Sequence, residues 1–442
     1  MAQKQTARGV FMLERILTDD FRGKLKLTFR DIENQQDRSD EKEFAKDEVR
    51  IREELLDTVT PHASDDTLDE DYLIAAVDGS GSGDLMTLDD VRVHLLSTST
   101  VVLDTNTRAG DPFRPLDRAT LENAFGRAQP FLDCHWHSGV RGDARTKMAD
   151  SLAEIYPLKD SDALVLPFFR DIMKRQLKSM SDLSGTNYGA YTSSLGTMES
   201  LITREQMLTN PAVHDELRTA SEYAAARIVL TSSIQPKYLL LDGAMSIFMH
   251  QARQYPSMPS GFMLRELCSL AREKHVVLCA VSKNHTIPFA HRIARMAQEA
   301  FGEGSKWFCL LPGSEDPGGG LYIYQDRTYI PPRLAVPYLF SFSMDNRPSR
   351  IDFDRIWWLE NVFVQDDPSK TRENEKALFQ EIEFMSRDAR WYGYPVALAL
   401  AHEECKLSYE DLRLAREVAG DVRHELGLDP RRTTPYREDF NL

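Results

Sequence analysis

Long hydrophobic runs are absent from this 442-residue sequence, and cysteine is scarce. No run reaches the length that spans a bilayer, and the first residues, MAQKQTARGVFMLERIL, lack the apolar core of a signal peptide. The five cysteines are scattered and odd in number, which fits reduced thiols better than a disulfide framework. We therefore expect a soluble, cytoplasmic protein with no membrane partner.

Positive charge is in the minority. Counting 54 Lys and Arg against 69 Asp and Glu gives a net charge of −15, which excludes a generally basic nucleic-acid coat but not a local basic channel. The sequence has no solenoid repeat, no Gly/Ser or Pro linker and no G-x-x-x-x-G-K-[ST] phosphate loop. Any work driven by ATP therefore needs a second protein. With 42% hydrophobic and 28% charged residues, the composition is that of a folded chain.

The N-terminal part differs from the rest. From Asp31 to Asp57 the sequence combines helix formers and mixed charges with few apolar positions, which predicts a solvated helical arm. An acidic stretch, Ser64 to Tyr72, separates it from the first long apolar run. We therefore predict a helical arm over residues 1–66 and a domain over residues 67–442.

Two apolar runs that end in Asp-Gly predict two buried strands, each followed by a turn, at Tyr72–Asp84 and Tyr238–Ser246. Val91–Asp104 is β-rich and should pair antiparallel with the first of them. Helix Gly261–Lys274 followed by strand His275–Asn284 is the α-to-β step of an α/β fold. The fold class is therefore α/β, with a mixed central sheet flanked by helices.

The remaining segments follow the same patterns. We expect helices through most of Leu116–Thr231, β-rich sequence at Leu321–Tyr324 and Ile356–Val364, and helices at about Glu373–Arg387 and Tyr409–Leu426.

The two Asp-Gly strands place Asp78 and Asp242 where side chains can project from a rigid scaffold. If the strands are neighbours, the two carboxylates meet and repel each other unless a divalent cation lies between them, and oxygen ligands suit Mg²⁺ or Mn²⁺. Such a site suits hydrolysis of phosphodiesters assisted by two metal ions. The alternative is that each Asp-Gly is an ordinary turn.

Two further residues could complete this site. Glu222, or alternatively Glu216, lies on the helix before the second strand and could be the third acidic ligand, although most helical glutamates are solvated surface residues. Lys283, just after a buried strand, could hold a scissile phosphate or a metal-bound hydroxide, or could simply begin a loop.

The segment YGYPVALALAHEECKLS combines a helix start at Pro395 with two candidate functional side chains. Tyr394 and His402 are eight positions apart, about 12 Å along a helix axis at 1.5 Å per residue, so they cannot easily bind the same atom. We assign His402 to the metal or the leaving group and Tyr394 to a phosphate or nucleotide. A histidine packed in the core is the alternative for His402.

DCHWHSG holds Cys134, His135 and His137, a third candidate cluster. No second ligand pair lies at zinc-finger spacing, so a structural role is favoured over a metal site.

Taken in order, AVDGS, LLLDGA, AVSKN and GYPVALALAHE resemble the motifs of the NurA nuclease family over roughly Tyr72 to Leu426. The resemblance implies an RNase H-like fold and a DNA nuclease that depends on Mn²⁺ or Mg²⁺, acting as a 5′-to-3′ exonuclease and single-strand endonuclease in end resection. It also implies a homodimer that docks on a HerA-type hexameric ATPase. A helical region at about residues 144–210 is longer than the family core and would be an insertion.

Residue by residue, the resemblance implies that Asp78 and Asp242 are the two aspartate ligands and that Tyr394 and His402 are the late Tyr/His pair. Lys283 occupies the family's Ser-Lys step. Two other functions share this sequence chemistry. One is the same nuclease acting in anti-phage defence, and the other is a catalytically silent adaptor that binds DNA and the ATPase.

Overall fold

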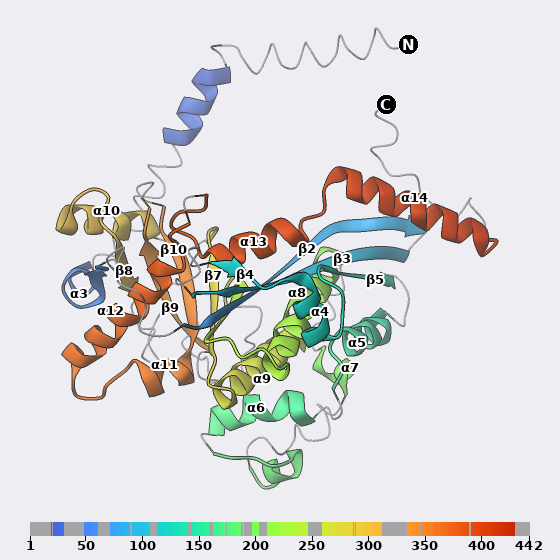
Figure 1. Ribbon diagram of the computed structural model, residues 1–442, viewed down its shortest axis with the longest axis horizontal. Helices are drawn as coiled ribbons and strands as arrows, with labels where there is room; N and C mark the ends of the chain where they lie inside the picture. Colours follow the sequence, from blue (N-terminus) through green and yellow to red (C-terminus); the bar gives the residue numbers. More distant parts are fainter. Residues whose placement is uncertain are drawn as a thin grey trace.

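Figure 1 shows the computed structural model of the chain, a central sheet with helices packed on both faces. The residues that the structure describes are 19, 21–30, 48–60, 71–88, 91–106, 113–138, 144–158, 162–173, 175–186, 189, 197–202, 210–245, 259–285, 287, 289–311, 334–343, 347–388 and 390–428. The predicted strand at Leu321–Tyr324 and the acidic stretch before Asp71 lie outside them.

The strands form one ten-stranded mixed sheet, in the order β1-β8-β9-β10-β7-β6-β2-β3-β4, with β5 paired to β3. The strands are β1 (Leu56–Thr58), β2 (Leu73–Leu88), β3 (Val91–Asp104), β4 (Arg114–Pro115), β5 (Phe131–Ser138), β6 (Tyr238–Asp242), β7 (Val277–Ser282), β8 (Trp307–Leu310), β9 (Ala335–Ser341) and β10 (Ser349–Asp354).

The middle of this sheet has RNase H-like topology. Strands β2, β3 and β5 form an antiparallel meander, β6 lies parallel to β2, and β7 lies parallel to β6. The resulting order β5-β3-β2-β6-β7 places the fourth of these five strands, counted along the chain, beside the first, as in that fold. The predicted α/β class and the antiparallel pairing of Val91–Asp104 are therefore confirmed.

Helices cover both faces of the sheet. They are α3 (Glu48–Arg50), the π-helix η1 (Ile51–Leu55), α4 (Arg118–Phe125), α5 (Ala144–Ile155), α6 (Asp162–Met173), the 3-10 helix η3 (Met180–Leu183), α7 (Met198–Leu201), α8 (Asn210–Thr231), α9 (Pro259–Glu273), α10 (Ala290–Phe301), α11 (Arg355–Asn361), α12 (Pro368–Phe384), α13 (Val396–Cys405) and α14 (Tyr409–Glu425).

Strand β2 separates two hydrophobic cores, because side chains alternate along a strand. Ile74 and Ala76 belong to the core that also contains residues of α10, α12 and α13. Ala75 and Val77 belong to the core that contains residues of α5, α6, α8 and α9. Even-numbered residues of this part of β2 therefore face α13, and odd-numbered residues face α8.

Three local predictions were wrong. Ile356–Val364 was expected to be β-rich, but α11 begins at Arg355, because the Asp354 side chain accepts from the Ile356 amide and caps the helix. The segment Phe131–Ser138, inside a stretch expected to be helical, forms β5 on the outer side of β3. Finally, β2 does not turn at Asp78, because β3 continues to pair with it beyond that point.

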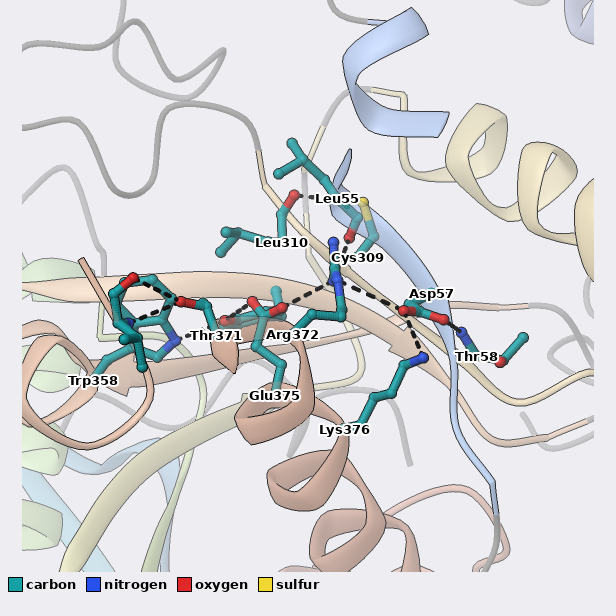
Figure 2. Close-up of polar contacts among 12 residues, drawn as sticks. Leu55, Asp57, Thr58, Cys309, Leu310, Trp358, Thr371, Arg372, Glu375 and Lys376 are labelled. Carbon is teal, nitrogen blue, oxygen red and sulfur yellow. Dashed lines mark hydrogen bonds and ion pairs between the residues drawn. The ribbon is translucent and has the colours of Figure 1, made fainter. Parts of the chain in front are cut away.

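The end of the predicted N-terminal arm is part of the sheet. Ile51 and Leu55 are buried, and β1 pairs antiparallel with β8. Figure 2 shows two ion pairs that connect helix α12 to strand β1 at this edge of the sheet. Asp57 pairs with Lys376 at 3.0 Å and with Arg372 at 3.6 Å. Residues 21–30 are helical and exposed.

The described parts of residues 144–210 are mainly helical. Helices α5 and α6 contribute buried side chains to the core beneath α8 and α9, and Asp171 of α6 accepts an ion pair from Arg265 of α9 at 3.0 Å. All five cysteines are free thiols, as expected. Among the described residues, no helix combines the length and the hydropathy needed to cross a bilayer.

Candidate active site

Asp78 and Asp242 lie on neighbouring parallel strands at the same level. The register pairs Val77 of β2 with Leu241 of β6, so the next residue on each strand is one of the two aspartates. Strand β6 ends at Asp242, whereas β2 continues beside β3 alone. Both aspartates follow the even-numbered alternation and face the α13 side. The predicted meeting of the two carboxylates at the end of the parallel ladder is therefore what the structure has.

Glu222 approaches strand β2 next to Asp78 from helix α8, on the opposite face of the sheet. It can do so because residue 79 is glycine: a Cβ built on Gly79 would lie 2.6 Å from Glu222 Oε1 and 2.7 Å from its Cγ. The carboxylate thus occupies the space of the missing side chain, which we call the Gly79 recess. Ser221, beside it on α8, is fastened to β3 through a 2.6 Å hydrogen bond with Thr98. Small residues on both elements allow this close approach.

Electrostatics shows that the three carboxylates interact. Burial, together with the charges of Asp78 and Asp242, raises the pKa of Glu222 to about 8, although Arg218 opposes this shift. Shielding from water and the charge of Asp78 likewise raise the pKa of Asp242. Carboxylates that share a poorly hydrated space repel each other, and a cation relieves that repulsion.

Arg218 is a positively charged residue of α8 that contacts both Glu222 and strand β2. Its Nη1 donates to Glu222 Oε1 at 2.7 Å and to the backbone oxygen of Gly79 at 3.4 Å. The charges of Glu222, Asp78 and Asp242 all contribute to a raised pKa for Arg218. Sequence reasoning missed this residue. The signal was its position one helical turn before Glu222, since residues at i and i+4 share a helix face.

His402 reaches Asp78 from helix α13. Its Nδ1 lies 2.8 Å from Asp78 Oδ2, and the other oxygen of Asp78 accepts from the Gly79 amide at 2.7 Å. The His402 side chain is 58% exposed, so the prediction that it contacts substrate or metal is sterically possible and the packed-core alternative is wrong. Two residues later, Glu404 accepts a 2.7 Å hydrogen bond from Ser99, the partner of Asp78 in the β2–β3 register.

Tyr394 lies before α13 and not on it, so the helical spacing used to separate it from His402 does not apply. Its hydroxyl donates to Asp242 Oδ1 at 2.9 Å, and burial raises the Tyr394 pKa far enough that it stays protonated. The Lys283 Nζ lies 3.8 Å from the centre of the Tyr394 ring, and partial burial lowers the pKa of Lys283. Each aspartate therefore has a side-chain partner, and the exposed Lys283 lies beside Tyr394.

Glu216, the alternative third ligand, lies elsewhere. Its two carboxylate oxygens accept from the Ser260 amide and hydroxyl, both at 2.8 Å, at the start of α9. It therefore satisfies the helix terminus, where amide groups lack partners within the helix. The structure thus brings together Asp78, Glu222, Asp242, Lys283, Tyr394 and His402, but not Glu216.

The residues fit a divalent cation by their chemistry. Among the described residues, no group of three or more His, Cys, Asp or Glu side chains is arranged so that it could hold a metal ion. At this site each carboxylate is instead held by a protein donor, from His402, Arg218 or Tyr394. The carboxylates of Asp78, Glu222 and Asp242 nonetheless offer the oxygen donors that Mg²⁺ and Mn²⁺ prefer. We name Asp78, Glu222 and Asp242 the carboxylate cluster.

The Cys134–His137 segment forms part of β5 and does not make a second site. His135 bonds to Asp133 at 2.9 Å, and His137 bonds to His94 of β3 at 2.7 Å. Neighbouring residues of a strand point to opposite faces, so Cys134 and His135 cannot act together. The structural interpretation of this segment is the one that its geometry favours.

No protein-family model matches the sequence, and no curated protein matches it. Solved structures similar to this chain include the NurA nuclease from Sulfolobus solfataricus, with 12% identity, coverage of 92% of this chain and 98% of that chain, and a TM-score of 0.44. NurA bound to dAMP and manganese has 10% identity, coverage of 90% and 95%, and a TM-score of 0.32. Ciona intestinalis endonuclease V in complex with DNA has 10% identity, coverage of 91% and 100%, and a TM-score of 0.24. The solved structures similar to this chain include NurA nucleases.

Proposed function

We propose that this protein is a DNA nuclease that hydrolyses phosphodiester bonds at the carboxylate cluster with the help of Mn²⁺ or Mg²⁺. The observation that carries the proposal is the Gly79 recess, which lets a helix carboxylate approach strand β2 beside Asp78, on the strand next to that of Asp242. The charges of these carboxylates raise one another's pKa, and a divalent cation relieves such repulsion. A bound ion supplies an activated water and neutralises the leaving oxygen.

The protein's own residues then have distinct tasks. Asp78, Glu222 and Asp242 would hold the metal, and Tyr394 keeps one oxygen of Asp242 in place through its hydroxyl. His402 orients Asp78 through Nδ1, which leaves its second ring nitrogen to ligate the metal or to protonate the leaving group.

Lys283 supplies positive charge beside the cluster. Its ammonium group lies against the ring of Tyr394, and the hydroxyl of the same tyrosine donates to Asp242. Because it is exposed, it can approach a bound scissile phosphate and stabilise the charge that develops there.

We further propose the family's manner of working: a homodimer that acts as a 5′-to-3′ exonuclease and single-strand endonuclease, together with a HerA-type hexameric ATPase, in DNA end processing or double-strand break repair. Because a net charge of −15 repels DNA, binding of DNA requires basic residues that are gathered along one channel. The sequence has no phosphate-loop motif, so the ATPase that moves the DNA would be a separate protein. The division into an arm (1–66) and a nuclease domain (67–442), with an insertion at about 144–210, belongs to the same proposal, with the end of the arm packed into the sheet of the domain through β1.

Cleavage of end-labelled DNA tests this proposal. The purified protein is incubated with single-stranded and blunt duplex DNA in Mn²⁺, Mg²⁺ or chelator, with and without a HerA-type hexamer. ATP is compared with a non-hydrolysable analogue. We expect cleavage that chelator abolishes, and duplex digestion that hydrolysed ATP accelerates. Absence of cleavage under every condition would favour the catalytically silent adaptor. Equal rates of duplex cleavage with ATP and with the analogue would contradict the dependence on an ATP-driven partner.

A further inference from the structure

Arg218 and Glu222 form an ion pair that is also connected to strand β2. They lie one turn apart on α8, and Arg218 Nη1 donates to Glu222 Oε1 at 2.7 Å. The same nitrogen lies 3.4 Å from the backbone oxygen of Gly79, the residue whose missing side chain makes room for Glu222. The guanidinium therefore joins the helix carboxylate to the strand at the level of Asp78.

The arrangement leaves part of Glu222 available to another ligand. Arg218 bonds to Oε1, and a carboxylate has two oxygens that together accept several bonds. A planar guanidinium also holds a carboxylate in a defined orientation, which an ammonium group does not. Carboxylates that bind metals are commonly held in this way by a residue that does not touch the metal.

We propose that Arg218 is a positioning residue for the metal site: it holds Glu222 in the Gly79 recess, beside Asp78, and leaves Oε2 to bind a divalent cation. This inference rests on the proposed function, because it assumes that the carboxylate cluster binds a metal. It assigns a role to Arg218 that lies outside the set of residues expected from the sequence.

A competing role for Arg218 predicts the opposite sign. A guanidinium that only neutralised Glu222 would compete with the metal, so its removal would tighten metal binding. A guanidinium that orients Glu222 strengthens metal binding, and its removal weakens it. The dissociation constant for Mn²⁺ therefore separates the two roles without any measurement of cleavage.

The experiment measures Mn²⁺ binding to the full-length, DNA-free protein, with the free ion quantified by electron paramagnetic resonance. We expect Arg218→Met to raise the Kd for Mn²⁺ by about 10- to 100-fold. The matched control is Arg227→Met. Arg227 lies later on α8, has the same 33% side-chain exposure, and pairs with Glu266 at 3.3 Å, so this variant should bind Mn²⁺ as the wild type does. Circular dichroism in chelator establishes that each variant is folded.

Arg218→Lys provides a second measurement, which also applies if the Met variant does not fold. It keeps the positive charge but loses the planar group, so its Kd should lie between those of the wild type and Arg218→Met. Unchanged or tighter Mn²⁺ binding in Arg218→Met, wild-type affinity in Arg218→Lys, or an equal loss in Arg227→Met would each overturn the inference. A wild-type protein that binds no Mn²⁺ would instead overturn the proposed function.

Discussion

Gly79→Ala tests the Gly79 recess most directly. The added methyl group would lie 2.6 Å from Glu222 Oε1 and 2.7 Å from Glu222 Cγ, closer than real Cβ atoms approach other atoms. The strand is held at this level by its pairing with β3, in which Gly79 lies opposite Thr98. The flexible Glu222 side chain must therefore leave the recess, and the carboxylate cluster loses its third member.

The expected change in stability is small, because two effects oppose each other. The pKa of Glu222 is raised from 4.5 to about 8, so at pH 7 the group takes up a proton on folding, and at 1.36 kcal/mol per pH unit this disfavours folding by about 3 kcal/mol. Release of the carboxylate to water regains this free energy. Overpacking by one methyl group costs about 1–3 kcal/mol. We expect the free energy of unfolding to change by less than about 2 kcal/mol.

The assay compares metal-dependent DNA cleavage with urea unfolding for the same variant. Gly79→Ala should lose most cleavage and Mn²⁺ binding while remaining folded. Gly81→Ala is the matched control, because its Cβ would meet the His214 ring at 2.5 Å, a similar clash on the same strand and helix that does not touch Glu222. Near-normal cleavage by Gly79→Ala, or an equal loss in Gly81→Ala, would refute the argument.

Four further results are expected. Asp78→Asn and Asp242→Asn should each abolish cleavage in folded protein, because each removes an anionic ligand at nearly constant volume; a variant that still cleaves would rule out that residue as a ligand. His402→Ala should lose most activity with little change in melting temperature, since the side chain is exposed, and normal turnover would exclude a catalytic role. Lys283→Ala should lower kcat more than it alters DNA affinity, whereas a lowered melting temperature with normal kcat would indicate a structural lysine. In chelator, the wild type should lose stability relative to Glu222→Gln as the pH rises from about 4.5 to about 8, because the folded state binds this proton more tightly; parallel urea-unfolding profiles would contradict the raised pKa.

The strands that carry the aspartates were predictable because they are apolar runs with clear ends. The β5 strand was not, since FLDCHWHS alternates weakly and acquires its conformation by pairing with β3. Asp78 was recognised through a turn signal that the structure does not use, because a glycine in a strand can serve a close approach as well as a turn.

Contacts between distant segments account for what the sequence could not supply. The choice between Glu222 and Glu216 depends on which helical residue faces Gly79 and which faces Ser260. Hydrophobic periodicity in the sequence places the two glutamates on one helix but does not show which residues of other elements each of them contacts. Arg218 was missed for the same reason, since its role depends on the backbone of a strand more than a hundred positions away.

The alternation of faces along β2 limits which changes in chain length this fold can accept. Ile74 and Ala76 pack toward α13, while Ala75 and Val77 pack toward α8. Deleting one residue between Leu73 and Asp78 would leave a strand that is still apolar and still able to pair. It would, however, turn the aspartate toward α8 and the glycine toward His402, exchanging the two halves of the site. Insertions and deletions should therefore be tolerated in the connections around this strand and excluded from the strand itself.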